Sequence, residues 1–167
     1  YWTHGTPSEN VRVKVISDLE LFANLKMKSL EVENSATVTV KDGSSLYVKE
    51  GITNRGTSAN FIIEKNANLI QESDLAINVG DFTVMQNSSP MILNDATLWS
   101  SPVNGQNLRN FSNQTLLKRF YKYNEPTNKF ASLFVNDPLY PNDNLVNEAT
   151  YNFETGLGYH IRVGTNH

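Results

Sequence analysis

Short pairs of apolar residues recur along the first half of the chain at a step of eight positions. An apolar-polar-apolar triplet near the start of each block is followed by a polar turn, and the blocks lie at 29–36, 37–44, 45–52, 60–67, 68–75 and 76–83. Alternation with a period of two over so few residues is typical of half-buried β-strands. A fixed step between such strands indicates a repeat architecture.

A strand of three or four residues buries too little apolar surface to offset the entropy lost on ordering it, so it needs neighbours stacked on it. Three octads bent around a triangle give a turn of about 24 residues, and successive turns pair in parallel. The sequence therefore predicts an all-β chain that begins with a short, right-handed, three-sided parallel β-solenoid. The side chains expected to point into its core are Leu30, Val38, Leu46, Phe61, Leu69 and Ile77.

Turn-forming residues separate the triplets at the expected corners of the solenoid. Glycine, asparagine and aspartate tolerate the tight or left-handed backbone that a corner needs, and they stand at Asn34, Asp42, Gly43, Gly51, Asn66 and Gly80. The segment from Thr53 to Ala59 breaks the rhythm and is expected to form a loop. A β-sandwich is the competing fold, because it also joins short strands by polar turns.

The pattern changes after Asp95, where the octad disappears and aromatic residues become dense. Longer strand candidates stand at 117–123 and 158–163, and the polar segment 124–128 is expected to form a hairpin turn. We expect two domains: the solenoid repeats over 1–95, and a mixed, mostly β capping subdomain over 96–167. The second would cover the backbone edges that the last turn of a solenoid exposes.

Composition narrows the classes of function. The net charge of −3 argues against nucleic acid as a partner, because binding to phosphates requires clustered lysine and arginine. There is no cysteine, so neither a disulfide nor thiol catalysis is available. No apolar stretch approaches the 18 or so residues of a membrane span, so membrane insertion is not expected.

Several motifs are similar to those of a known family. They are Trp99-Ser-Ser-Pro-Val103, Arg119-Phe-Tyr-Lys-Tyr-Asn124, Gly156-Leu-Gly-Tyr-His-Ile-Arg162, Asn68-Leu-Ile-Gln71 and the opening Trp2-Thr-His-Gly5. In this order, after short β-repeats, the set resembles a module of large secreted surface proteins of Bacteroidota, and the likeness covers nearly the whole chain. It implies export by the type IX route, an extracellular or cell-surface location, and an adhesin-like or filamentous parent protein. The implied partners are the secretion machinery and other segments of that parent.

Catalytic constellations are missing from the sequence. There is no glycine-x-serine-x-glycine elbow and no phosphate-binding glycine loop, and no two histidines have metal-ligand spacing. The expected function is therefore that of a non-catalytic structural or adhesive module, with formation of filaments included in this class. We expect no enzymatic activity and no cofactor, with calcium as the one ion to consider.

Two groups of residues are candidate sites. Calcium binds carboxylate and carbonyl oxygens, and the turn-rich loop 135–147 gathers such groups at Asp137, Asn142, Asp143 and Asn144. Tyr121 and Tyr123 lie two positions apart on a strand and so share a face. Rings on such a face can stack on sugars, so the alternative function is a carbohydrate-binding module of a secreted polysaccharide-degrading enzyme, with surface glycans as partners. The opposing interpretation is that these rings are buried against the solenoid.

Overall fold

The structure, a computed structural model, describes residues 2–164. The chain forms two compact units, with the boundary between Asn87 and Ser88. Nearly all of the regular structure is β, with about 6% helix. None of the helices in the described part of the chain is long and apolar enough to cross a membrane.

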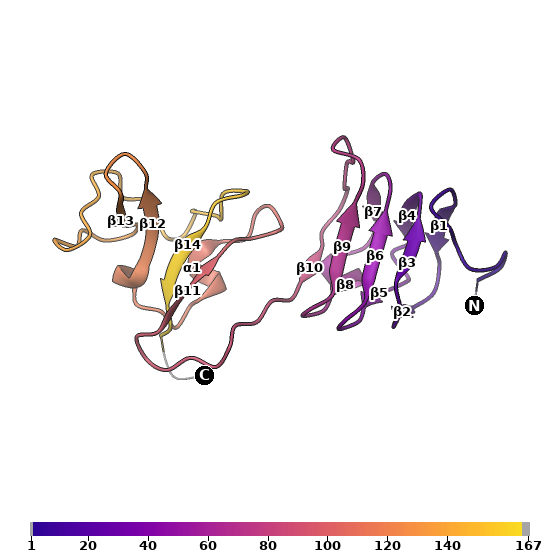
Figure 1. Cartoon of the computed structure of the whole chain (residues 1–167), viewed down its shortest axis with the longest axis horizontal. Helices are drawn as coiled ribbons and strands as arrows, with labels where there is room; N and C mark the ends of the chain where they lie inside the picture. The colour runs from indigo at the N-terminus through magenta and orange to yellow at the C-terminus, as the bar shows by residue number, and fades with distance from the viewer. Residues whose placement is uncertain (1, 165–167) are drawn as a thin grey trace. The chain divides into compact units, whose positions relative to one another are not determined.

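The first unit consists of short strands joined by tight corners. Its elements are β1 (Arg12–Val15), β2 (Leu19–Leu21), β3 (Leu25–Met27), β4 (Ser29–Val32), β5 (Val38–Val40), β6 (Ser45–Val48), β7 (Ile52–Asn54), η1 (Ser58–Asn60), β8 (Phe61–Ile63), β9 (Asn68–Gln71) and β10 (Thr83–Val84). They form three parallel sheets, ordered β1–β4–β7, β2–β5–β8–β10 and β3–β6–β9 (Figure 1). This arrangement is a β-solenoid of about three turns, which confirms the predicted fold class.

Stacked partners in the solenoid lie about 21 residues apart along the chain, rather than 24. The turn is shorter because some corners need few residues. Residues 22–24 connect β2 to β3, and Lys28 alone separates β3 from β4.

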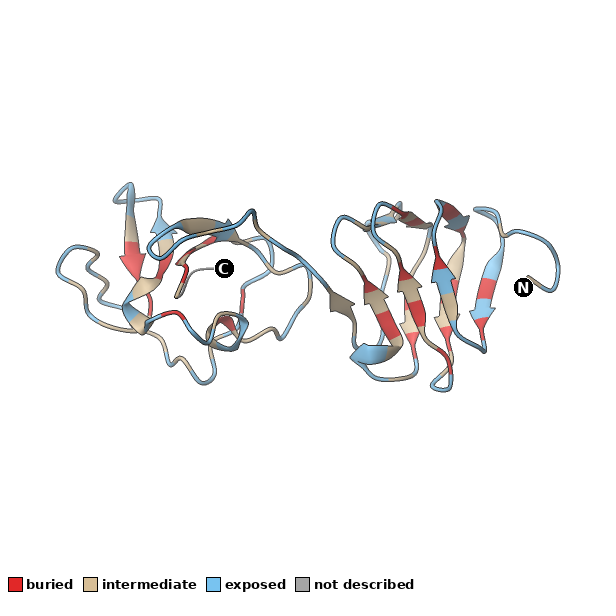
Figure 2. Cartoon of the chain, turned by 90° about the horizontal axis from the view of Figure 1, so that it is seen from below, coloured by how far each residue is buried: buried red, intermediate tan, exposed pale blue. Residues whose placement is uncertain are grey.

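Identical positions of successive coils stack to form one continuous core. Val38 lies between Leu19 and Phe61, and Leu46 lies between Leu25 and Leu69. Buried positions occur in the strands of all three sheets (Figure 2), as expected for side chains that share one core. Of the predicted inward residues, Leu30, Val38, Leu46 and Phe61 are buried, and Leu69 is half-buried against this core.

The prediction for Ile77 is wrong, because its side chain is 76% exposed. The backbone around Val79 runs parallel to β7 and exchanges hydrogen bonds with Ile52 and Asn54. In this register Asn78, not Ile77, contacts the coil, since its Oδ1 accepts a hydrogen bond from the Ile52 N–H. A shift of one residue turns alternate side chains to the opposite face.

On the β1–β4–β7 and β3–β6–β9 sides of the solenoid, polar side chains end the core at the third coil. Asn54 stacks on Val32, and Gln71 stacks on Val48. The loop predicted from Thr53 is shorter than expected, since Thr53 and Asn54 still belong to β7.

The second unit is an antiparallel sheet with short helices. Its elements are β11 (Ala96–Trp99), α1 (Leu108–Phe111), η2 (Leu117–Arg119), β12 (Phe120–Asn124), β13 (Lys129–Ser132) and β14 (Tyr159–Arg162). The strand order is β11–β14–β12–β13. One face of this sheet packs on a separate core, formed by Leu108, Phe120, Leu133, Phe153, Tyr159 and Ile161. The strand predicted at 117–123 starts later, at Phe120, because η2 precedes it. That this unit covers the end of the solenoid stays a prediction.

Candidate binding surfaces

Five aromatic rings form a continuous row on the other face of the antiparallel sheet. The consecutive pairs and the distances between their ring centroids are Tyr123–Phe130 at 5.6 Å, Phe130–His160 at 5.0 Å, His160–Tyr121 at 5.5 Å and Tyr121–Tyr140 at 4.7 Å. Four of the rings project from β12, β13 and β14, and Tyr140 lies in the loop between β13 and β14. The row packs neighbouring strands and the loop together.

The structure brings Tyr121 and Tyr123 to this same face, but in different environments. Tyr121 is only 4% exposed, whereas Tyr123 is 43% exposed. Planes of adjacent rings in the row are inclined by 35° to 66°, so they do not form one flat platform. Of the two tyrosines, Tyr123 therefore offers the accessible ring.

Burial sets the protonation of the groups in this row. Burial raises the pKa of the Tyr121 hydroxyl, and burial together with the nearby Arg162 lowers the pKa of His160. Within residues 2–164, the buried Ser132 Oγ and His160 Nδ1 have no hydrogen-bond partner. His160 is therefore a neutral ring at physiological pH, packed against Phe130 and Tyr121.

The predicted calcium ligands lie in one loop, where the side-chain oxygens of two of them accept hydrogen bonds from the loop backbone. Asp137 Oδ1 accepts the Leu139 N–H at 3.0 Å, and Asn142 Oδ1 accepts the Asn144 N–H at 2.9 Å. The Asn142 amide also donates to the Ser132 carbonyl at 2.7 Å. No group of three or more acidic, histidine or cysteine side chains suited to a metal occurs in the described ranges. Calcium binding by Asp137, Asn142, Asp143 and Asn144 stays a prediction.

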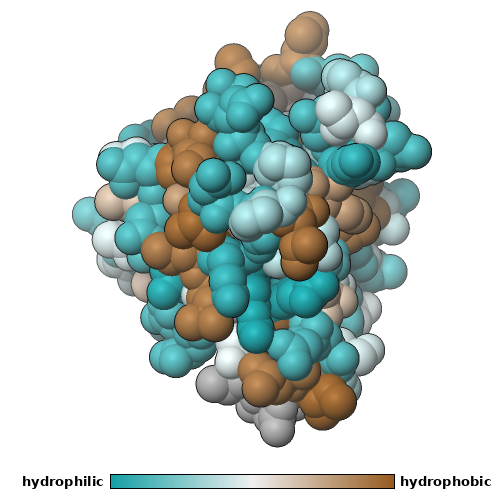
Figure 3. All heavy atoms as spheres, turned by 90° about the vertical axis from the view of Figure 1, so that its left-hand side faces the viewer, coloured by the Kyte–Doolittle hydropathy of each residue, from teal (hydrophilic) through white to brown (hydrophobic). Residues whose placement is uncertain are grey.

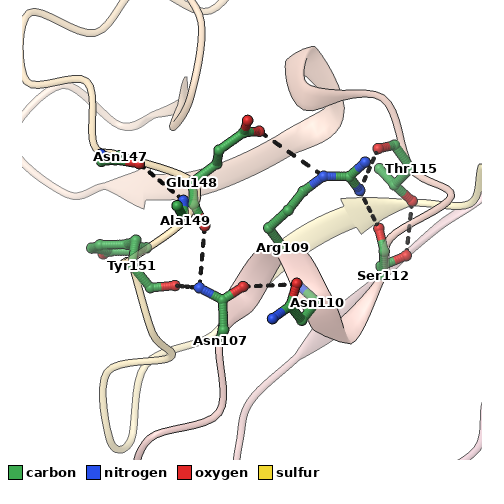
Figure 4. A network of polar contacts seen from close by, with 9 residues as sticks. All are labelled: Asn107, Arg109, Asn110, Ser112, Thr115, Asn147, Glu148, Ala149 and Tyr151. Atoms are coloured by element: carbon green, nitrogen blue, oxygen red, sulfur yellow. Dashed lines mark hydrogen bonds and ion pairs between the residues drawn. The ribbon is translucent and has the colours of Figure 1, made fainter.

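Arg109, which the sequence reasoning did not single out, is the centre of a polar network in the second unit (Figure 4). Its guanidinium donates to the carbonyls of Ser112 and Thr115 at 2.8 and 2.9 Å, and pairs with Glu148 at 4.0 Å. The same group lies over the Phe120 ring. These contacts fix the backbone that follows α1, so we assign Arg109 a structural role.

Asn107 joins the start of α1 to a distant loop. Its Oδ1 accepts the Asn110 N–H, and its amide donates to the carbonyls of Glu148 and Tyr151 (Figure 4). Asn107 is the N-cap of α1, and Ser112 is its C-cap.

A second polar cluster surrounds Glu154. Its Oε1 accepts hydrogen bonds from the hydroxyls of Tyr151 and Tyr159 and pairs with the Lys122 ammonium at 2.9 Å. The hydrogen bond from Tyr151 holds the pKa of Glu154 below its usual value, and burial raises the pKa of Tyr151. The cluster joins β12 and β14 to the connecting loop, which is a structural task.

Two faces of the solenoid carry ion pairs that run from coil to coil. On the β1–β4–β7 face, Glu31 lies between Lys14 and Arg55, at 3.3 and 2.9 Å. Hydrogen bonds to Glu33 and then to Glu31 raise the pKa of Lys14. The hydrogen bond between Arg55 and Glu31 raises the pKa of Arg55 and lowers that of Glu31.

The β2–β5–β8 face has the opposite order of charge. Lys41 lies between Glu20 and Glu64, at 3.4 and 2.6 Å. Glu64 also accepts the Asp42 N–H at 3.1 Å. The charges on each of these two faces therefore alternate in sign from coil to coil, which favours one register of the coils.

The third face, β3–β6–β9, instead carries a shallow groove of about 230 Å³. Lys26, Tyr47 and Ile70 form one row across it, because β3, β6 and β9 pair in register at these positions. The Lys26 ammonium lies 5.3 Å from the centre of the Tyr47 ring. The groove is lined by Glu9, Lys26, Met27, Tyr47, Val48, Lys49, Ile70 and Glu72.

Exposed apolar residues do not gather into one large patch on the face shown in Figure 3, where they are scattered among hydrophilic residues. Apolar residues scattered singly in this way are ordinary on a protein surface.

Comparison with known proteins assigns the chain to a family without assigning an activity. No curated protein and no solved structure gives a significant match. One family model, described as a domain of unknown function (DUF8693), matches residues 2–167. Because the match spans both units, the chain belongs to this family.

Proposed function

We propose that the chain is a non-catalytic structural and adhesive module of a large exported surface protein. The observation that carries this proposal is the construction of the solenoid. Three coils share one core, and parallel ladders on each side join every coil to the next. A stack of this kind is stiff and displays broad, regular faces, which suits a spacer or an adhesive segment.

The resemblance of the motifs at 99–103, 119–124 and 156–162 to modules of type IX-secreted proteins of Bacteroidota supports the location. By this likeness the module is extracellular or bound to the cell surface. Its partners are other segments of the parent protein and the secretion machinery.

Location and adhesion are tested separately. Antibodies against the purified chain should label intact cells of the source organism, and labelling only after permeabilisation would refute export.

Beads coated with the chain should attach to biofilm or matrix-coated surfaces more often than beads coated with an unrelated β-protein. Equal attachment of the two kinds of bead would remove the adhesive role and leave only that of a spacer.

A second candidate function is carbohydrate binding. It is favoured by the accessible Tyr123 ring, whose hydroxyl donates a hydrogen bond to the side-chain oxygen of Asn128. Aromatic faces bordered by amides suit sugar rings, which have apolar faces and polar edges. Calorimetric titration with soluble polysaccharides should then show binding that Tyr123→Ala abolishes. Phe22→Ala, which removes an exposed ring from the solenoid, is the matched control and should leave it unchanged.

A further inference from the structure

The β3–β6–β9 face differs from the other two faces of the solenoid in the state of its charges. Among residues 2–164, no ion pair involves Glu9, Glu72, Lys49 or Lys26, and the Lys26 ammonium lies over the Tyr47 ring. On the other two faces, charges are joined from coil to coil. The unpaired charges border the one groove described above, whose floor includes Tyr47 and Ile70.

We propose that this face, defined by Glu9, Lys26, Tyr47, Lys49, Ile70 and Glu72, is a self-association surface that binds the same face of a second copy of the chain. Two basic and two acidic groups surround an apolar centre, so the face is neutral and complementary to itself. In a two-fold interface each residue contact occurs twice, with the copies exchanged. Lysines of one copy then meet glutamates of the other, while the exposed edges of Tyr47 and Ile70 pack together.

The other ends and faces of the solenoid do not offer this complementarity. Lys14 and Arg55 place positive charge at both ends of one ion-pair ladder, and Glu20 and Glu64 place negative charge at both ends of the other. Coil-on-coil stacking of two copies would bring like charges together. Side-by-side association through the β3–β6–β9 face avoids this repulsion.

The size of the face predicts a weak dimer. The three strands are three or four residues long. At a spacing of about 4.8 Å they present roughly 200 Å² per copy. Stable complexes bury about 1,200 Å² or more in total, so the expected affinity is micromolar to millimolar. Such contacts gain strength when many copies are held on one surface. This inference depends on the solenoid face alone and not on the adhesive role.

Sedimentation velocity of the full chain tests the proposal, from about 10 μM to about 1 mM. The monomer has a mass of 18.8 kDa, and the average mass should rise with concentration. Lys49→Glu and Glu72→Lys should each weaken association about fivefold or more, because each change breaks symmetric pairs and adds repulsion. An equimolar mixture of these two variants should associate at least as strongly as the natural chain, since their faces carry opposite charge.

Lys129→Glu and Glu125→Lys are the matched controls, because they make the same charge changes on the β12–β13 hairpin of the second unit. Both should associate like the natural chain. Thermal unfolding should show that all four variants are folded. A mass that stays monomeric at every concentration would overturn the proposal. So would control variants that weaken association equally, or a mixture of Lys49→Glu and Glu72→Lys that fails to restore it.

Discussion

The buried amide of Asn54 donates a hydrogen bond to the backbone carbonyl of Asp81, with an Nδ2–O distance of 2.6 Å. The same amide donates to the Thr57 carbonyl at 2.8 Å, and its Oδ1 accepts the Gly56 N–H at 3.2 Å. One side chain at the end of the core therefore holds both the corner after β7 and the segment that passes over it.

Replacing Asn54 with alanine should destabilise the first unit by about 1–3 kcal/mol, because it leaves buried backbone groups without partners. Urea unfolding followed by circular dichroism measures this loss. Thr53→Ala is the control, since Thr53 is half-buried in the same strand. Equal effects of the two changes would show that the Asn54 hydrogen bonds contribute little.

Gly80→Ala should destabilise the first unit more than Gly43→Ala. Both glycines have a left-handed backbone, with φ of 94° and 78°. A Cβ at Gly80 would lie 2.1 Å from the Asn54 carbonyl oxygen, whereas a Cβ at Gly43 meets no atom within 4 Å. Each change costs about 1 kcal/mol from backbone strain, and Gly80→Ala adds the steric clash. Equal unfolding midpoints would mean that the segment around Gly80 moves away freely.

Val40→Asp tests the inward register of the solenoid. Val40 is fully buried and stacks between Leu21 and Ile63. An unpaired carboxylate there should cost several kcal/mol or unfold the unit, because burial of a charge is expensive. Thr39→Asp, one residue away and facing outward, should cost far less. A loss below about 1 kcal/mol for Val40→Asp would be incompatible with this core.

Stability of the solenoid should fall in acid. Hydrogen bonds from Arg55 and Lys41 lower the pKa values of Glu31 and Glu64 in the folded chain. The ion pairs of these two glutamates add to the free energy of unfolding at a pH above about 4.3, the pKa of glutamate in the unfolded chain. This added stability is lost as the pH falls through the lower pKa of the folded chain. The urea midpoint should therefore decline from pH 5 to pH 3, and Glu64→Gln should make this decline smaller. Glu72→Gln is the control, because Glu72 forms no ion pair within residues 2–164. An identical acid dependence in both variants would exclude a role for the ladder.

Tyr121→Ala and Tyr123→Ala should differ sharply in their effect on the second unit. Tyr121 is buried between Tyr140 and His160, so its loss should cost about 3–5 kcal/mol. Tyr123 is exposed, so its loss should cost about 1 kcal/mol or less. Near-ultraviolet circular dichroism during thermal unfolding measures both. The reverse order would mean that the row of rings is packed differently.

The sequence was sufficient to predict the solenoid and most of its core. Leu30, Val38 and Leu46 recur at nearly constant spacing, and a strand of three residues has no stable alternative to stacking on its neighbours. The octad alone could not show that Ile77 faces outward. A shift of one residue in strand register moves each side chain to the opposite face, and nothing in the local sequence marks this shift. It also overestimated the length of the turn, which depends on how tightly each corner closes.

For the candidate sites too, the sequence predicted one part and the tertiary structure decided the rest. Alternation placed Tyr121 and Tyr123 on one face, but only the pairing of β12 with β13 and β14 buried Tyr121 beneath its neighbours and left Tyr123 exposed. The ion-pair ladders and the β3–β6–β9 face also form only when the coils are stacked, since the residues of each lie many positions apart in the sequence. Local spacing determined the strands, because side-chain alternation is a property of the backbone. Tertiary structure decided which charges and rings meet, because those contacts depend on the register between coils and strands.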